Sequence, residues 1–252
     1  MTDERIVDAL RASRRVVFLT GAGVSAESGI PTFRDRQTGL WERFDAAELA
    51  TPEAFERDAP LVWGWYEWRR ALARSAQPNA AHRAIAAIGD RIPNFTLITQ
   101  NVDDLHERAG SRDVVHLHGE LGRSRCEQCG LEHRDPAGRV ASLEQRRIDP
   151  PRCRGCGARV RPGVVWFGEQ LPEDAWQRAR DAAQRSELFF VCGTSSLVQP
   201  AASLTDLAIG AGALTVQINP NLTGIESTVS VALRGSAGAV LSEILAATWG
   251  VR

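Results

Sequence analysis

The sequence of 252 residues predicts an α/β fold in which helices cover both faces of a doubly wound parallel sheet. Two observations carry this prediction. Short runs of β-branched and aromatic residues alternate with stretches of helical length, which is typical of repeated strand–helix units. These runs are apolar on both faces, as strands buried inside a parallel sheet are. The expected strands span residues 16–20, 95–99, 114–117, 188–191, 214–218 and 229–233.

Composition and charge exclude several classes of protein. The chain carries 30 basic residues against 31 acidic ones, so it has no overall basic field and nucleic acid is not an expected partner. Polar residues interrupt the most apolar stretch, residues 201–218, so we expect no membrane partner or membrane span. Because no apolar signal region follows the acidic N-terminal residues, we expect a cytoplasmic protein.

Two stretches do not fit the strand–helix alternation and are expected to be inserts. Residues 36–79 are helical in pattern and rich in tryptophan. Residues 121–161 are rich in arginine, poor in apolar residues and punctuated by Gly and Pro. The remaining segments, 1–35, 80–120 and 162–252, would then form the domain that contains the parallel sheet.

Polar or glycine-rich segments directly follow five of the expected strands. Because the carboxyl ends of parallel strands meet at one rim, where open sheets bind ligands, these segments are expected to share a site. The alternative is that they are ordinary turns, in which Gly, Asn and Ser are common. The five segments are Gly21-Ala22-Gly23, Gln100-Asn101-Val102-Asp103, His118-Gly119, Gly193-Thr194-Ser195 and Asn219-Pro220.

The first of these segments begins a possible dinucleotide-binding motif. Residues 21–26 fit G-x-G-x-x-G/A, whose glycines let the backbone approach a pyrophosphate closely. The acidic residue expected about 20 positions later is not cleanly present, since Glu42 and Asp45 lie beyond a predicted loop. The motif alone is weak evidence, and Asn219 is the candidate to hold the ribose.

Four of the five cysteines form two C-x-x-C pairs, Cys126 with Cys129 and Cys153 with Cys156. Their separation is slightly above the usual zinc-ribbon interval. Four thiolates close a tetrahedral site and leave no position for water, so we expect one structural zinc ion. A redox pair is the alternative, although two matched pairs are more than that chemistry needs. Cys192 lies in an apolar strand and is expected to be buried in the core.

Two histidines, His116 and His118, lie two positions apart in the third expected strand and should face the same side of the sheet. Only His118 stands at the carboxyl rim, directly before a glycine. An unperturbed imidazole has a pKa of about 6.5 and can accept a proton near neutral pH. We therefore expect His118 to be the catalytic general base.

Together these motifs resemble the sirtuin family of NAD-dependent protein lysine deacylases. The resemblance implies a Rossmann-type NAD-binding domain and a small zinc-ribbon plus helical domain. It also implies a cleft between them that binds NAD and acylated lysine segments of other proteins. The matching strings, in the family's order, are GAGVSAESGIPTFRD at 21–35, TQNVDDLHERAG at 99–110, HLHGEL at 116–121, the two cysteine pairs, VVWFGEQLP at 164–172, CGTSSLVQPA at 192–201 and the strand end Gln217-Ile218-Asn219.

The resemblance also implies a reaction and the residues that carry it out. The acyl oxygen would attack the anomeric carbon of NAD, and His118 would then deprotonate a ribose hydroxyl. The implied products are free lysine, nicotinamide and O-acyl-ADP-ribose. The substrate peptide is expected to add as a strand near Val165-Trp166-Phe167-Gly168-Glu169 and Ser196-Leu197-Val198, with Val165, Phe167, Gly168 and Glu169 as its binding residues. The residues expected to bind NAD are Gly21, Ala22, Gly23, Ser25, Ala26, Thr32, Phe33, Arg34, Gln100, Asn101, Asp103, Gly193, Thr194, Ser195, Asn219 and Ala237.

The helical insert contains a possible determinant of acyl preference. Tyr66 and Arg69 lie three positions apart and therefore on one face of a helix. They resemble the Y-x-x-R pair of the sirtuin class that prefers succinyl, malonyl and glutaryl groups, and Ala50 matches the small residue that leaves room for a longer chain. A guanidinium binds a distal carboxylate through charge-assisted hydrogen bonds, whereas acetyl offers no partner. We therefore expect a preference for acidic acyl groups, with weaker deacetylation.

Other interpretations stay open at this point. Arg69 could be a solvated surface charge, and the protein could be mainly a deacetylase. An NAD hydrolase or ADP-ribosyltransferase would share the cofactor cleft, and a non-catalytic NAD sensor or a zinc-ribbon nucleic-acid module would lack turnover. The sequence also contains no lysine, which fits either a coding bias toward arginine or protection of the enzyme from acylation of its own side chains.

Overall fold

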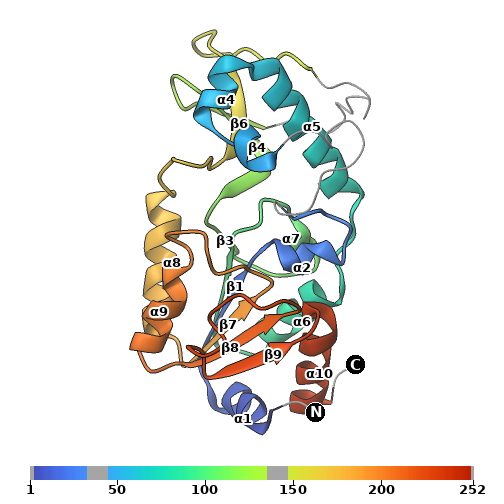
Figure 1. Cartoon of the computed structure of the whole chain (residues 1–252), viewed down its shortest axis with the longest axis vertical. Coiled ribbons are helices and arrows are strands. Elements are labelled where there is room, and N and C mark those ends of the chain that lie inside the picture. The colour runs from blue at the N-terminus through green and yellow to red at the C-terminus, as the bar shows by residue number, and fades with distance from the viewer. Residues whose placement is uncertain (1–2, 33–44, 135–146, 251–252) are drawn as a thin grey trace.

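The computed structural model describes residues 3–32, 45–134 and 147–250, and it has a larger part built on a parallel sheet and a smaller part at one end (Figure 1). The helices are α1 (Glu4–Ala12), α2 (Ala22–Ala26), α3 (Ala46–Leu49), α4 (Pro52–Arg57), α5 (Ala59–Ser75), α6 (Ala80–Gly89), α7 (Leu105–Arg108), α8 (Glu173–Arg185), α9 (Ser203–Gly210) and α10 (Ala237–Trp249). The strands are β1 (Arg15–Thr20), β2 (Asn94–Thr99), β3 (Val115–His116), β4 (Gly119–Cys126), β5 (Glu132–Arg134), β6 (Val160–Val164), β7 (Leu188–Cys192), β8 (Leu214–Asn219) and β9 (Val231–Arg234).

The larger sheet contains six strands, all parallel, in the order β3-β2-β1-β7-β8-β9. Counted along the chain within this sheet alone, the order is 3-2-1-4-5-6, as in doubly wound dinucleotide-binding folds. The order reverses between β1 and β7, so ligands are expected outside the carboxyl ends of the strands at that point. The predicted fold class is confirmed.

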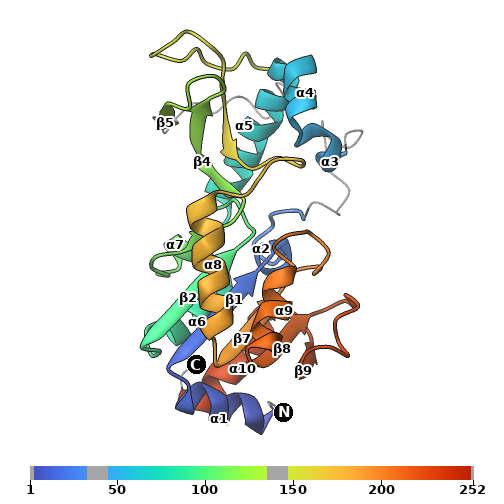
Figure 2. The same ribbon diagram turned by 90° about the vertical axis from the view of Figure 1, so that its left-hand side faces the viewer.

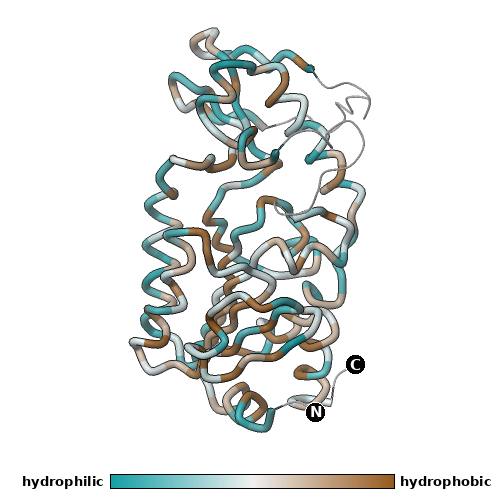
Figure 3. Tube along the Cα trace, in the orientation of Figure 1, coloured by the Kyte–Doolittle hydropathy of each residue, from teal (hydrophilic) through white to brown (hydrophobic). Residues whose placement is uncertain are grey.

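Helices cover both faces of the parallel sheet, with α6 and α10 on one side and α8 and α9 on the other (Figures 1 and 2). Alternate residues of β1 serve the two layers. Val16 and Phe18 belong to the core shared with α1, α6 and α10, whereas Val17 and Leu19 belong to the core shared with α8 and α9. Brown segments in Figure 3 follow these central strands. Burial on both faces explains why the strands are continuous apolar runs in the sequence.

The smaller part combines helices α3, α4 and α5 with a three-stranded antiparallel sheet in the order β5-β4-β6. Arg70 of α5 joins the helices to this sheet, since its buried guanidinium donates to the Leu121 carbonyl oxygen at 2.7 Å and to Ser124 Oγ at 2.9 Å. The carboxylate of Glu67 forms an ion pair with Arg70, with 2.6 Å between Glu67 Oε1 and the guanidinium nitrogen. A buried cation needs such partners, so this contact fixes how α5 packs on β4.

The third expected strand is shorter than predicted. It contains only Val115–His116, and Asp113, with a φ of 51°, turns the chain shortly before it. The prediction that His116 and His118 share one strand is therefore wrong, because His118 lies in the turn between β3 and β4. The other five expected strands are found with ends shifted by no more than two residues. The antiparallel sheet runs from Gly119 to Val164, slightly beyond the expected insert 121–161 at both ends.

The described helices include none that is both long enough and apolar enough to cross a membrane.

Candidate active site

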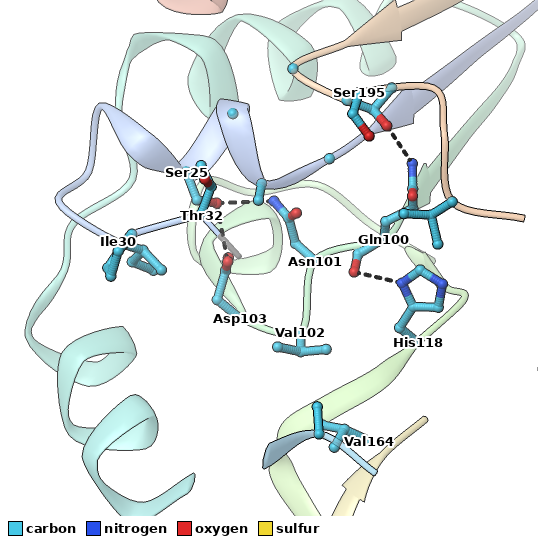
Figure 4. Close-up of a pocket in the computed structure, with 18 of the residues that line it drawn as sticks. Ser25, Ile30, Thr32, Gln100, Asn101, Val102, Asp103, His118, Val164 and Ser195 are labelled. Carbon is cyan, nitrogen blue, oxygen red and sulfur yellow. Dashed lines mark hydrogen bonds between the residues drawn. The ribbon is translucent and has the colours of Figure 1, made fainter. Parts of the chain in front are cut away.

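A cavity of about 530 Å³ lies at the carboxyl ends of the parallel strands (Figure 4). All five polar or glycine-rich segments that follow strands contribute to it, so the prediction that they share one site is confirmed. Helix α5 and the segment after β6 supply further residues. From the larger part, the expected NAD-binding residues and the expected base that line it are Gly21, Ala22, Gly23, Ser25, Ala26, Thr32, Gln100, Asn101, Asp103, His118, Gly193, Thr194, Ser195 and Asn219.

Two glycines let the ends of β1 and β7 approach each other. Gly23 N donates to the Gly193 carbonyl oxygen at 2.8 Å, and a Cβ on Gly23 would lie 2.7 Å from the same oxygen. Gly193 has a φ of 60°, and a Cβ there would lie 2.5 Å from Val24 N. The cavity is therefore bounded here by backbone, which a phosphate group can approach closely.

His118 lines the cavity with a defined tautomer. Its Nδ1 lies 3.1 Å from the Gln100 carbonyl oxygen (Figure 4). Because a carbonyl oxygen only accepts, the proton resides on Nδ1, and Nε2 of the neutral ring carries the free lone pair. Burial lowers the pKa of His118, and the bond to Gln100 opposes that change only in part. The imidazole is therefore neutral at pH 7, as a general base must be.

Three side chains form a buried hydrogen-bonded chain along the cavity (Figure 4). Asn101 Nδ2 donates to Ser25 Oγ at 3.0 Å, and Ser25 Oγ donates to Asp103 Oδ2 at 3.0 Å. Burial raises the pKa of Asp103, while the backbone N–H of Leu105 and the hydroxyl of Ser25 act in the opposite direction. The amide of Asn101 and the carboxyl group of Asp103 are thus held in fixed orientations.

The strand ends on the other side of the cavity are joined through Thr194. Gln100 Nε2 donates to its Oγ1 at 3.0 Å, and Asn219 Nδ2 donates to its carbonyl oxygen at 2.9 Å. Because Gln100 follows β2, Thr194 follows β7 and Asn219 ends β8, these bonds hold three strand ends in one arrangement.

The cavity extends to the helical insert, where Ala50, Tyr66 and Arg69 line it together. Tyr66 is buried, and burial raises the pKa of its hydroxyl to about 12. The half-buried Arg69 places its Cζ 5.1 Å from the centroid of the Trp65 ring. Burial lowers the pKa of Arg69, while Tyr66 and Asp103 raise it. A cation and a neutral phenol therefore face the same space.

The segment after β6 joins the two parts of the molecule through its backbone. Val165 N donates to the His118 carbonyl oxygen at 2.9 Å, and Phe167 N donates to the Ala50 carbonyl oxygen at 2.9 Å. Val165, Phe167 and Gly168 line the cavity, and the Phe167 side chain is 47% exposed. The expected peptide-binding segment therefore lies between the expected base and the helical insert.

Glu169 also lines the cavity, but its carboxylate is engaged within this segment. Arg161 donates to both of its oxygens, at 2.5 and 2.8 Å, and Trp166 N donates to Oε2 at 2.9 Å. Burial raises the pKa of Glu169, but these donors outweigh it and the pKa is lowered. Glu169 thus holds the turn that presents Phe167 and Gly168.

Three of the expected cofactor residues are not found among the described residues that line the cavity. Phe33 and Arg34 lie outside the described residues. Ala237 is buried in the first turn of α10 and is not among the residues lining the cavity.

Several residues that line the cavity were not predicted from the sequence. On α5, Leu72 follows Arg69 by three positions, so continuing the helical spacing from the Tyr66 pair would have identified it. The loop after β8 also reaches the cavity, and its residues lie within four positions of Asn219. Those not named in advance include Trp68, Leu72, Asn221, Leu222 and Thr223.

The four paired cysteines form one cluster away from the cavity, with all sulfur atoms within 4.8 Å of one another. Three of the Sγ–Sγ distances are 3.4, 3.6 and 3.7 Å, and tetrahedral zinc with bonds near 2.3 Å requires roughly 3.8 Å. Backbone N–H groups of Cys129 and Gln128 each lie 3.4 Å from Cys126 Sγ and lower its pKa, whereas the neighbouring sulfur atoms raise the pKa of Cys156 in the absence of a metal. The donor set and its dimensions therefore fit a zinc ion. Cys192 is buried in β7, as predicted.

Comparison with known proteins identifies relatives over the whole chain. The NAD-dependent protein deacylase of Methylococcus capsulatus is 54% identical over 245 residues, covering 97% of this chain and 96% of that protein. The crystal structure of a Sir2 homologue–NAD complex superposes with a TM-score of 0.90 at 45% identity, covering 98% and 94% of the two chains. A Sir2 structure bound to an acetylated peptide gives a TM-score of 0.85 at 28% identity, covering 100% of both chains. The model of the Sir2 family matches residues 21–200, and the chain therefore belongs to the Sir2, or sirtuin, family.

Proposed function

We propose that this protein is an NAD-dependent deacylase of lysine side chains in other proteins. One observation carries the proposal. His118, neutral and with Nδ1 bonded to Gln100, lines a cavity that combines the backbone-bounded strand ends with the Tyr66–Arg69 pair of the helical insert. A general base thus lines a cavity whose strand-end side is suited to a dinucleotide and whose Tyr66–Arg69 side is suited to an acyl chain. Two relatives, the NAD-dependent protein deacylase of Methylococcus capsulatus and the Sir2 homologue solved as an NAD complex, support the same assignment.

The strand ends of the larger part fit NAD, because Gly23 and Gly193 pack too closely for either to carry a Cβ and so leave bare backbone that a phosphate can approach. When bound, NAD supplies an anomeric carbon whose leaving group, nicotinamide, departs as a neutral amide. Gly21, Ala22, Gly23, Ala26, Thr32 and, by motif position, Arg34 would surround the phosphates and the nicotinamide ribose. Phe33 would shield the anomeric carbon.

The hydrogen-bonded chain of the cavity would hold the nicotinamide end. Asn101 and Asp103 would bind the carboxamide, with Ser25 fixing the orientation of both side chains. Gln100 would contact ribose hydroxyls, and Gly193, Thr194, Ser195, Asn219 and Ala237 would lie toward the adenosine.

His118 would take a proton from a ribose hydroxyl at Nε2. The bond from Nδ1 to the Gln100 carbonyl oxygen stabilises the imidazolium that forms, because a carbonyl dipole favours the positive charge. Positioned base catalysis of this kind contributes about 10²- to 10⁴-fold in rate.

We assign the domains as the sequence divides them. Residues 1–35, 80–120 and 162–252 form the NAD-binding domain, residues 36–79 the helical insert with the acyl pocket, and residues 121–161 the zinc-binding insert. Cys126, Cys129, Cys153 and Cys156 would hold one structural zinc ion, which stabilises an insert with few buried apolar side chains of its own.

We propose further that acidic acyl groups, succinyl, malonyl or glutaryl, are the preferred substrates. Ala50 leaves space beside Tyr66 and Arg69, and the guanidinium and the phenol can both donate to a distal carboxylate. Acetyl has no carboxylate to accept hydrogen bonds from Arg69 and Tyr66, so acetyl-lysine should be the poorer substrate.

The protein partner would be an extended segment that contains the acylated lysine. It would lie along Val165, Phe167 and Gly168 and the exposed residues Leu197 and Val198. Pairing through the backbone gives affinity with little sequence preference. A Sir2 structure bound to an acetylated peptide supports acylated peptides as the substrate class.

The test is nicotinamide release from NAD, measured with and without acyl-lysine peptides of identical flanking sequence. The proposal expects release that depends on peptide, with O-acyl-ADP-ribose and deacylated peptide formed in equal amounts. The ratio of kcat/KM for succinyl and acetyl peptides tests the acyl preference. Release that ignores the peptide would instead identify an NAD hydrolase, and binding of NAD without products would identify a sensor.

A further inference from the structure

The indole N–H of Trp166 donates to Tyr66 Oη at 2.9 Å. The two residues are 100 positions apart in the sequence, Tyr66 on α5 and Trp166 in the segment after β6. Both line the cavity, and both side chains are almost completely buried. The hydroxyl of the acyl pocket is therefore bonded to the segment expected to carry the substrate peptide.

The indole ring is held from several directions. The guanidinium carbon of Arg161 lies 3.5 Å from the ring centroid, and the Phe55 ring packs against it at a centroid distance of 5.3 Å. The backbone N–H of Trp166 is bonded to Glu169, whose carboxylate also binds Arg161. A ring confined in this way has one direction for its N–H. The direction from which Tyr66 Oη accepts this hydrogen bond is therefore fixed.

The hydroxyl of Tyr66 has one proton to donate and two lone pairs to accept with. Burial raises its pKa to about 12, so the group is neutral and retains its proton. The indole N–H occupies one lone pair, and an indole has no acceptor for the phenolic proton. Within the part of the chain that the structure describes, no acceptor is bonded to the O–H of Tyr66. The proton is therefore directed away from Trp166.

We propose that Trp166 is a positioning residue for acyl recognition, which fixes the Tyr66 hydroxyl as a donor toward the carboxylate tip of an acidic acyl group. This inference rests on the acidic-acyl preference proposed above. Tyr66 and Arg69 then act as one donor set, and Trp166 influences selectivity without contacting the distal carboxylate itself. Without the indole N–H, the hydroxyl is free to rotate, and ordering it again on binding costs affinity.

A purely structural role for Trp166 predicts a different outcome. If the indole only filled space between β6 and α5, its loss would weaken reactions of all acyl peptides alike. A positioning role requires the effect to fall on acidic acyl groups, and to disappear once the Tyr66 hydroxyl has been removed. The ratio of succinyl to acetyl activity distinguishes these two cases.

The experiment compares Trp166→Phe, Tyr66→Phe and the double variant in the full-length enzyme. Trp166→Phe is expected to lower the succinyl-to-acetyl ratio of kcat/KM about fivefold, mainly through KM for the succinyl peptide. In the Tyr66→Phe background the same change should leave the ratio unaltered, because the hydroxyl it positions is absent. The matched control is Trp63→Phe on α5, a buried tryptophan that does not line the cavity, and it should leave the ratio at the wild-type value.

A second measurement covers the case in which Trp166→Phe fails to fold. The protein has seven tryptophans and one tyrosine, so indole ¹⁵N–H spectra of the wild type and Tyr66→Phe are compared. Loss of the accepted hydrogen bond should shift one indole signal, and adding a succinyl peptide without NAD should shift the same signal in the wild type only. The role of Trp166 would be overturned if Tyr66→Phe left every indole signal at its wild-type position. It would also be overturned if the two substitutions lowered the succinyl-to-acetyl ratio independently, so that their effects multiplied in the double variant. A wild-type enzyme that does not distinguish succinyl from acetyl would instead refute the acyl preference itself.

Discussion

The Nδ1–H of His118 donates to the backbone carbonyl oxygen of Gln100 across 3.1 Å, from the turn after β3 to the residue directly after β2. The tautomer of the proposed base is thus set by the parallel sheet itself, since the acceptor is a main-chain atom that mutation of side chains does not remove. Among the residues that the structure describes, no carboxylate is bonded to Nε2, which is left unprotonated. The base therefore does not depend on a second titrating side chain bonded to its ring.

Replacement of His118 by alanine should abolish turnover and spare cofactor binding. The described backbone and side chains that line the NAD side of the cavity do not depend on the imidazole, so the Kd for NAD should change less than threefold, or about 0.7 kcal/mol. Loss of the base should lower kcat about 10²- to 10⁴-fold. Calorimetric titration with NAD and single-turnover deacylation measure the two quantities. A variant that deacylates at the wild-type rate would exclude His118 as the base.

The rate should depend on pH in the direction set by the burial of His118. Burial lowers the pKa of His118 from its ordinary value of 6.5, so the ring is already neutral at pH 7. The protonated ring cannot accept a proton, and kcat/KM should therefore be flat near neutrality and fall only as the pH drops below 6.5. A stopped assay of kcat/KM at a series of pH values measures this acidic fall in rate. If kcat/KM instead began to fall at a pH above 7, another group, or a raised pKa of His118, would control the rate.

Gly23→Ala should weaken NAD binding through backbone crowding. The added Cβ would lie 2.7 Å from the Gly193 carbonyl oxygen, so two strand ends must move apart. Overpacking of this kind costs roughly 1–3 kcal/mol, and we expect a Kd for NAD at least about tenfold higher. The matched control is Gly210→Ala in α9, where nothing lies within 4 Å of the new methyl group. Equal NAD affinities for the two variants would contradict the close approach proposed for the phosphates.

The parallel sheet was predictable because its central strands, β1, β7 and β8, are buried on both faces and therefore leave continuous apolar runs in the sequence. The exception is β3, where pairing with β2 covers only Val115 and His116. A two-residue ladder has no periodicity that a sequence window can detect. The rim was predictable for a related reason, since ligand-binding residues in such sheets directly follow strands.

The contacts between the two parts could not be predicted in the same way. The bond from Trp166 to Tyr66 and that from Phe167 N to Ala50 join residues about 100 positions apart in different elements. Their pairing depends on how α5 packs on β4 and β6, which the buried Arg70 helps to fix. No local spacing encodes that packing, so only the i, i+3 relation within α5 was accessible from the sequence.

Loss of one cysteine of the cluster should remove the metal and unfold the zinc-binding insert. Cys129→Ser keeps the size of an exposed side chain but removes one of four thiolates, and structural zinc contributes its binding energy directly to folding. We expect the zinc content, measured by elemental analysis, to fall from one ion per chain to well below one ion per chain, and the Tm to fall as well. Cys192→Ala is the control, because it removes a buried thiol of β7 that lies outside the cluster. It should retain one zinc ion, and zinc retained by Cys129→Ser would contradict a four-cysteine site.

Arg69→Met should separate acidic from neutral acyl substrates. Methionine keeps an unbranched apolar side chain of similar reach in the cavity but removes the charge and every donor of the guanidinium. A succinyl carboxylate would lose charge-assisted hydrogen bonds, so kcat/KM for a succinyl peptide should fall at least tenfold, about 1.4 kcal/mol. Activity on the matched acetyl peptide should change less, because acetyl offers Arg69 no partner.

The control for this variant is Arg74→Met, which removes an exposed arginine from the last turn of the same helix. It applies the same change in charge and side-chain chemistry outside the cavity, and both acyl activities should stay at the wild-type level. The measurement is the initial rate of each of the two variants, relative to the wild type, with a succinyl and an acetyl peptide that differ only in the acyl group. Equal losses on succinyl and acetyl peptides in Arg69→Met would mean that the guanidinium supports the fold of the pocket rather than binding the carboxylate, because a structural defect does not distinguish between acyl groups.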